Sequence, residues 1–196
     1  MASSYRLQRM PEVIRTALPK WWVVPERSEA SRYQFLQRSG LINVDRPRLI
    51  VAGGPYRNDR MSPQLLDAFA KLPPNYGIIF SWMPQGNPDR LACEAHMKRL
   101  GLTERVIILD PVGFSDLLAL YACCDIGILL YPNSGVGHFY QAPGRLTEYL
   151  RCGLSIVCSA FPGLELLTLK NRLGSVADPY NPTSIAQAIQ DIGSAS

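Results

Sequence analysis

Short apolar runs separated by helix-like segments constrain this chain more than any other feature. Each run is strand-sized and shows little of the polar alternation that is typical of a strand with one solvated face. Strands buried on both faces occur in parallel sheets that are covered by helices. We therefore predict an α/β fold with a doubly wound, Rossmann-like, six-stranded parallel sheet. The predicted strands span residues 49–52, 77–82, 105–109, 125–131, 156–159 and 175–177.

Helix signals fill the segments between the runs. Ser62 is a suitable N-cap and Pro63 a suitable first residue for a helix over 63–72. Asn87 and Gly101 are suited to start and stop a helix over 88–100. Further helices are predicted over residues 115–123, 143–153, 164–169 and 183–192.

Residues 1–47 lack this alternation, and prolines interrupt them repeatedly. The apolar patch 21–24 is expected to form a strand or a docking segment, and 31–39 a short helix. We interpret 1–47 as a linker or the remnant of a preceding domain, 48–193 as the folded domain and 194–196 as a tail. Residues 1–60 hold eleven Lys and Arg against five Asp and Glu. This excess lies mainly before the predicted fold, which favours a charged linker over a nucleic-acid surface.

Composition excludes several classes of protein. The chain is 47% hydrophobic and 18% charged, and no run approaches the roughly 18 apolar residues of a membrane span. Five cysteines form no C-x-x-C pair, so we expect small core residues in a reducing, cytoplasmic compartment. The two histidines lack ligand spacing, so neither a metal nor a cofactor is expected.

Two loops at predicted strand ends are eligible for ligand binding. Gly53 and Gly54 would permit close approach of a ligand, and Arg57 and Arg60 would attract an oxyanion. This loop matches neither G-x-G-x-x-G nor the G-K-[ST] phosphate loop, and a turn with solvated arginines is the alternative. The long loop 132–142 contains His138, a possible base, although a lone loop histidine is usually incidental. No catalytic residue is assigned.

The third candidate is the helix that starts near Pro143. A helix N-terminus presents unpaired N–H groups and a positive dipole end, which suit a phosphate. Arg145 lies in its first turn, and Glu148, one turn later, is an acceptor suited to sugar hydroxyls. The alternative is an ordinary loop–helix–strand connection with two surface charges.

Together these stretches resemble the nucleotide-sugar-binding half of a GT-B glycosyltransferase of the retaining group 1 type (family four). The resemblance covers residues 48 to about 192 and is most specific over 143–157, which is similar to "P-x-K-l-x-E-y-m-a-c-G-l-P-V-v". Residues 53–54, 101–106, 117–130, 174–179 and 182–189 are similar to its other motifs. The implied donor-binding residues are Gly53, Gly54, Arg57, Arg60, Tyr140, Gly144, Arg145, Leu146, Thr147 and Glu148.

The resemblance also implies roles for these residues. Glu148 would hold the donor ribose, amides near Leu146 and Thr147 would face the diphosphate, and Arg57 or Arg60 would stabilise the leaving group. The chain departs from the family where Tyr140 replaces a sugar-contacting glutamate and Arg145 replaces a lysine.

A GT-B enzyme needs a second domain to hold the acceptor, and 47 leading residues are too few to form one. We therefore expect the partners to be a nucleotide-sugar donor and an acceptor-binding N-terminal domain or subunit, with no nucleic acid and no transmembrane segment. The expected activity is sugar transfer, with little or none by this chain alone. The alternatives are a non-catalytic nucleotide-binding or interaction module and half of a GT-B sugar-nucleotide epimerase.

Overall fold

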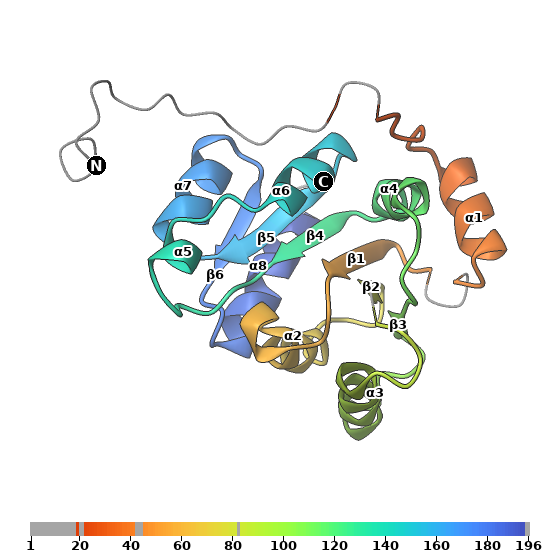
Figure 1. Cartoon of the computed structure of the whole chain (residues 1–196), viewed down its shortest axis with the longest axis horizontal. Helices are drawn as coiled ribbons and strands as arrows, with labels where there is room; N and C mark the ends of the chain where they lie inside the picture. Colours follow the sequence, from red (N-terminus) through yellow and green to blue (C-terminus); the bar gives the residue numbers. More distant parts are fainter. Residues whose placement is uncertain (1–18, 20–21, 42–44, 82, 195–196) are drawn as a thin grey trace.

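A computed structural model describes residues 19, 22–41, 45–81 and 83–194. Within these residues, six parallel strands form one sheet in the order β3-β2-β1-β4-β5-β6 (Figure 1), as the apolar runs predict. The chain winds outward from β1 in one direction and then from β4 in the other, so the switch point lies between these two strands. The strands are β1 (Arg48–Gly53), β2 (Tyr76–Ser81), β3 (Val106–Ile108), β4 (Ile126–Leu129), β5 (Ser155–Ser159) and β6 (Gly174–Ala177).

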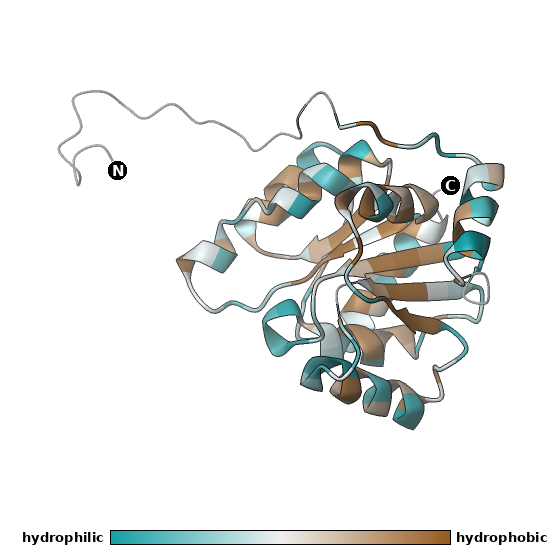
Figure 2. Cartoon of the chain, turned by 45° about the vertical axis from the view of Figure 1, so that its right-hand side comes forward, coloured by the Kyte–Doolittle hydropathy of each residue, from teal (hydrophilic) through white to brown (hydrophobic). Residues whose placement is uncertain are grey.

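Helices cover both faces of the sheet. One core lies between the sheet and α2 (Ser62–Phe69), α3 (Pro88–Leu100) and α8 (Pro182–Ser194). The other lies between the sheet and α1 (Glu29–Arg38), α4 (Phe114–Cys123), α6 (Gly144–Arg151) and α7 (Pro162–Lys170). The strands are accordingly hydrophobic throughout the centre of the molecule (Figure 2). All five cysteines are buried and free, which agrees with their interpretation as core residues.

Local signals place both ends of α3 correctly. The side chain of Asn87 accepts a hydrogen bond from the Asp89 N–H at 2.8 Å, and α3 ends at Gly101, whose φ of +67° favours glycine. These two residues bound α3 where the sequence predicts.

Three sequence predictions need correction. Ser62 is the first residue of α2 rather than its N-cap, because its hydroxyl bonds the preceding loop, accepting from the Arg57 N–H and donating to the Pro55 carbonyl. The same helix ends at Phe69, short of the predicted residue 72, because a residue before proline is disfavoured in the α conformation. The loop after β4, expected to be irregular, contains the short helix α5 (Val136–Phe139).

The described part of the leading segment packs on the domain. Helix α1 packs against α4, and Trp22 contacts Phe114 with ring centroids 3.7 Å apart. Asp125, just before β4, pairs with Arg27 at 2.7 Å and with Arg32 at 3.1 Å. Trp21 lies outside the described residues, so the predicted patch 21–24 is seen only in part. Across the described ranges, no helix is both long and apolar enough to cross a bilayer.

Candidate functional site

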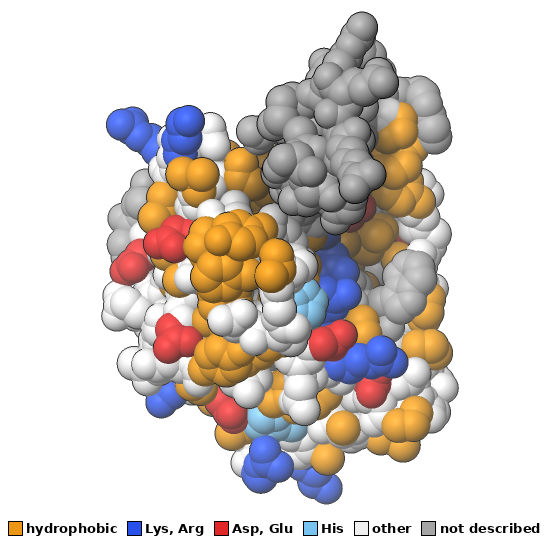
Figure 3. All heavy atoms as spheres, turned by 60° about the vertical axis from the view of Figure 1, so that its left-hand side comes forward, with side chains coloured by type: hydrophobic (Ala, Val, Ile, Leu, Met, Phe, Trp, Pro, Cys, Tyr) orange, Lys and Arg blue, Asp and Glu red, His pale blue; other side chains and the backbone are white. Residues whose placement is uncertain are grey.

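A cleft of about 550 Å³ opens at the carboxyl end of the sheet, beside the switch point between β1 and β4. In Figure 3 a hollow with Lys or Arg side chains lies beside a group of exposed hydrophobic side chains. The cleft is lined by Gly54, Pro55, Arg60, Ser81, Leu117, Tyr121, Tyr131, Gln141, Pro143, Gly144, Arg145 and Glu148. Its position is where open parallel sheets bind ligands.

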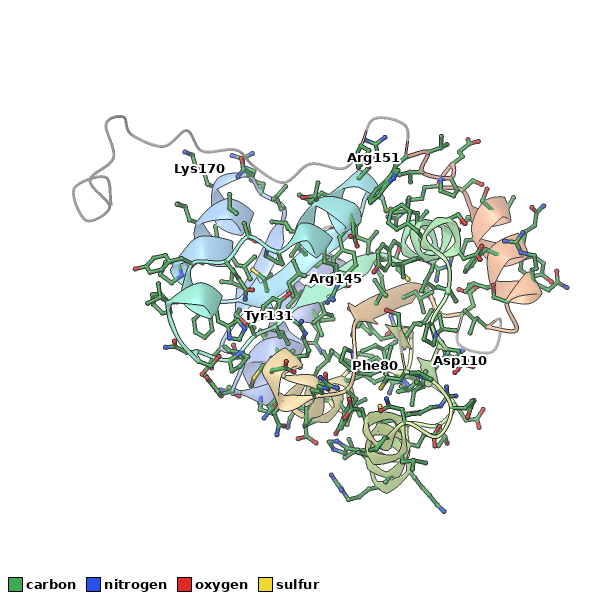
Figure 4. All side chains as sticks on the ribbon, viewed as in Figure 1. Phe80, Asp110, Tyr131, Arg145, Arg151 and Lys170 are labelled. Atoms are coloured by element: carbon green, nitrogen blue, oxygen red, sulfur yellow. The ribbon has the colours of Figure 1, made fainter. Side chains whose placement is uncertain are left out.

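Arg145 lies against the end of β1 (Figure 4), and its guanidinium donates to the Gly53 carbonyl oxygen at 2.5 Å. A Cβ on Gly53 would lie 2.8 Å from Cδ of Arg145, and one on Gly54 would lie 3.3 Å from Nη2. The two glycines therefore admit an arginine side chain, whereas the sequence suggested that they admit a ligand. Gly54 also has φ of +99°, which a larger residue would adopt only with strain.

Tyr149, on α6, also contacts Gly53 and so supports the contact between Gly53 and Arg145. It is fully buried, and its hydroxyl accepts a hydrogen bond from the Gly53 N–H at 3.1 Å. Its ring covers Gly127 of β4, where a Cβ would overlap the ring atoms, and the Tyr121 ring meets it edge-on at 4.8 Å. One side chain of α6 thus contacts both strands of the switch point.

The charges of the cleft are predominantly positive. Burial lowers the pKa of Arg145, but Tyr149, Tyr131, Tyr121 and Glu148 outweigh it, so the pKa is raised and the side chain stays charged. Arg60 lies 5.1 Å over the Tyr131 ring, and the start of α6 adds its dipole. Burial raises the pKa of Glu148, although Arg145 acts in the opposite direction.

Two of the residues that line the cleft each have a buried side-chain donor without an acceptor. Nε of Arg60 and Nε2 of Gln141 have no hydrogen-bond partner within the described structure. A buried donor without a partner costs about 1–3 kcal/mol. The described residues supply no acceptor for either donor.

The structure brings together only part of the predicted site. Gly54, Arg60, Gly144, Arg145 and Glu148 line the cleft, and Gly53 lies behind Arg145. The remaining four predicted residues are elsewhere and do not line the cleft: Arg57, Tyr140, Leu146 and Thr147.

Three of these four have other environments. Arg57 pairs with Asp89 at 2.7 Å with more than half of its side chain exposed. Tyr140 is 63% exposed and packs edge-on against Phe139. Leu146 is buried in the core, and its N–H donates to the Pro143 carbonyl at 2.9 Å instead of facing the cleft.

Several lining residues were missed by sequence reasoning. Tyr121 and Tyr131 look like ordinary apolar positions in a helix or strand, and no local spacing separates them from core tyrosines. Gln141 had a usable signal, since it is a polar residue within the loop singled out for its length. His138, weighed as a base, contacts Ser134 and stacks on Tyr131 with ring centroids 5.8 Å apart. No cluster of three or more metal-ligating side chains occurs in the described ranges.

A doubly wound sheet with a basic cleft at its switch point defines a Rossmann-like domain. Residues 46–194 match the family described as "Glycosyl transferases group 1". The chain therefore belongs to the group 1 glycosyltransferases, which have the GT-B fold.

The individual curated relatives have low sequence identity to this chain. The D-inositol 3-phosphate glycosyltransferase of Mycobacterium sp. (strain KMS) is 28% identical over 133 residues, covering 65% of this chain but 28% of the relative. The enzyme of the same name from Mycolicibacterium vanbaalenii is 24% identical over 145 residues, covering 67% of this chain and 30% of the relative. The chain thus spans less than a third of the length of these curated relatives.

Solved structures show the same fold. Anabaena HepE in complex with UDP superposes with a TM-score of 0.65 at 22% identity, covering 85% of this chain and 44% of that one. The lipopolysaccharide-biosynthesis glycosyltransferase WaaG gives a TM-score of 0.63 at 18% identity, covering 84% and 42%. The fold corresponds to one half of a GT-B enzyme.

Proposed function

We propose that the cleft binds the nucleoside diphosphate of a sugar donor, and that this chain is the donor-binding half of a sugar transferase. The observation that carries the proposal is a cleft in which Arg60 and Arg145 line the surface beside the start of α6, together with buried, unpartnered donors on Arg60 and Gln141. A diphosphate offers charged acceptor oxygens for such donors.

The cleft contains both cationic side chains and an acceptor side chain, which supports a ligand with two chemically different parts. The cationic groups of Arg60 and Arg145, with the start of α6, suit the diphosphate. Glu148 is an acceptor on the same helix, and we assign it to the ribose hydroxyls, as the resemblance to the family implies. Leu117, Pro143 and the ring of Tyr121 supply apolar surface for the rest of the nucleoside.

The acceptor is expected to bind elsewhere. The chain spans less than half of each of the two glycosyltransferase structures described above. We propose that an acceptor-binding domain or subunit completes the active site, and that this chain alone binds donor with little or no transfer.

Calorimetric titration of the 196-residue chain with UDP, GDP and ADP tests the proposal. We expect at least one diphosphate to bind, and Glu148→Ala to abolish that binding. Glu165→Ala on α7, outside the cleft, is the matched control and should bind as the wild type does. If the folded wild-type protein binds none of the three, the donor-site proposal is wrong.

A second assay addresses turnover. Sugar transfer should appear only when a candidate acceptor-binding partner is added to the chain and its donor. Conversion of the donor sugar nucleotide without any acceptor would instead support an epimerase. Donor binding without turnover across candidate partners would support a non-catalytic module.

A further inference from the structure

Gln141 is half-buried, and its Nε2 atom is buried without a hydrogen-bond partner. In the described ranges, three side chains have a buried polar atom without a hydrogen-bond partner: Arg60, Gln64 and Gln141. Arg60 and Gln141 line the same cleft and each leaves a donor unused, whereas Gln64 leaves an acceptor unused and is not among the lining residues. Two residues that line the cleft therefore each hold an unused donor, and they come from two separate segments of the chain.

The backbone holds Gln141 in place. A Cβ added to Gly163, in the first turn of α7, would lie 2.6 Å from the carbonyl carbon of Tyr140 and 2.9 Å from the carbonyl oxygen of Gln141. The loop is thus packed directly on the α7 backbone, with no room for a side chain at 163. Because the backbone at 140–141 cannot withdraw toward α7, the Gln141 amide remains at the cleft.

The surroundings of this amide select for a negatively charged acceptor. Arg60 and Arg145 line the cleft with it, and α6 begins three residues later. A neutral hydroxyl would gain little from that positive field, whereas a phosphate oxygen would gain from every group in it. Glu148, the carboxylate of the cleft, lies on the following helix and suits a different part of the ligand.

We propose that Gln141 is a specificity residue for the distal phosphate of the donor, and that Gly163 positions it. This assignment rests on the proposed function. It means that Gln141 makes the site favour a nucleoside diphosphate over its monophosphate. The nucleoside and its first phosphate bind without Gln141, and the second phosphate accepts the hydrogen bond from Nε2. The tyrosine at 140, exposed and outside the cleft, takes no part in this contact.

Titration with a matched pair of nucleotides tests the assignment. The tightest-binding diphosphate among UDP, GDP and ADP is compared with its own monophosphate on wild type and on Gln141→Met, which keeps side-chain length but removes the amide. We expect the diphosphate to bind about tenfold more weakly to the variant, and the monophosphate to bind within about twofold of wild type. Gln141→Glu should weaken diphosphate binding further, because a carboxylate repels the phosphate.

Gln64→Met is the control, since it also replaces a buried amide that has an unpartnered atom. It should leave both affinities unchanged. Thermal unfolding should show Gln141→Met to be at least as stable as wild type, because an unpaired donor has been removed. Gly163→Ala should reproduce the selective loss for the diphosphate, since it displaces the loop rather than the nucleoside site.

The outcomes separate the two proposals. Unchanged diphosphate affinity of Gln141→Met, or an equal loss for both nucleotides, would overturn the role of Gln141 and leave the donor site standing. Failure of the wild-type protein to bind any diphosphate would overturn the donor site and this assignment together.

Discussion

The guanidinium of Arg145 lies across the backbone of Gly53, to whose carbonyl oxygen it donates a hydrogen bond. The two residues are 92 positions apart in sequence, on α6 and at the end of β1. This contact joins the two loops that the sequence singles out separately. It also fixes the charge of Arg145 at the cleft.

Two substitutions of Arg145 should show how much of the diphosphate affinity depends on its charge and how much on its planar guanidinium. Arg145→Met removes the cation, and we expect nucleoside diphosphate affinity to fall about ten- to a hundredfold. Arg145→Lys should retain part of that affinity, because an ammonium keeps the charge without the planar fork. Calorimetry checks both. Arg151→Met, at the other end of α6 (Figure 4), is the control and should bind normally. Equal binding by Arg145→Met and wild type would remove Arg145 from the donor site.

Gly53→Ala should damage stability and binding together. The new Cβ would lie 2.8 Å from Cδ of Arg145 and 3.0 Å from the Tyr149 hydroxyl, so one or both must move. We expect a loss of about 1–3 kcal/mol in the free energy of unfolding, measured by denaturant titration, and weaker diphosphate binding. A Cβ on Gly137 meets nothing within 4 Å, so Gly137→Ala should leave both quantities near wild type.

Tyr149→Phe tests the support beneath the arginine. The substitution leaves the Gly53 N–H buried without its acceptor, which costs about 1–3 kcal/mol. Urea unfolding measures the difference against Tyr33→Phe, a variant of an exposed tyrosine on α1 that should be neutral. A stability of Tyr149→Phe equal to wild type would show that the hydroxyl contact contributes nothing.

Glu148→Gln should show a pH-dependent gain in stability. Burial raises the pKa of Glu148 in the folded state, so the folded protein holds this proton more tightly than the unfolded chain does. Its contribution to stability is therefore fully present below the ordinary value of 4.5 and is lost as pH rises through the folded-state pKa.

A glutamine at position 148 stays neutral at every pH, so the variant does not lose stability in this way as pH rises. The variant should accordingly melt at a higher temperature than wild type near pH 7, with the gap closing as pH falls through the raised folded-state pKa and absent below about 4.5. Thermal scans across this range check it, with Glu165→Gln expected to follow wild type. A gap that is independent of pH would contradict the argument.

The sequence predicts the fold well because the relevant information is local. Strands buried on both faces require apolar runs, and caps such as Asn87 and Gly101 act within one turn. Even the leading segment gives a correct short helix at α1, although its predicted start was two residues late. The end of α2 moves because Pro73 disfavours the α conformation in the residue before it.

The site is predicted less completely because it depends on distant contacts. Gly53 and Gly54 are identified correctly as places of close approach, but the group that approaches is Arg145. Arg57 and Arg60 look equivalent in the sequence, and only the structure shows that Arg57 pairs with Asp89 while Arg60 lies over Tyr131. The contact between Gly163 and residues 140–141 likewise has no local signature.

The contacts of Tyr149 have a consequence for how a diphosphate associates with the site. Its ring lies on β4 and its hydroxyl meets β1, so α6 is seated in the core when the sheet forms. The cleft is consequently preorganised, and an arriving diphosphate finds the Arg145 cation already oriented. Association should therefore proceed in a single bimolecular step, with little entropy lost in ordering the helix.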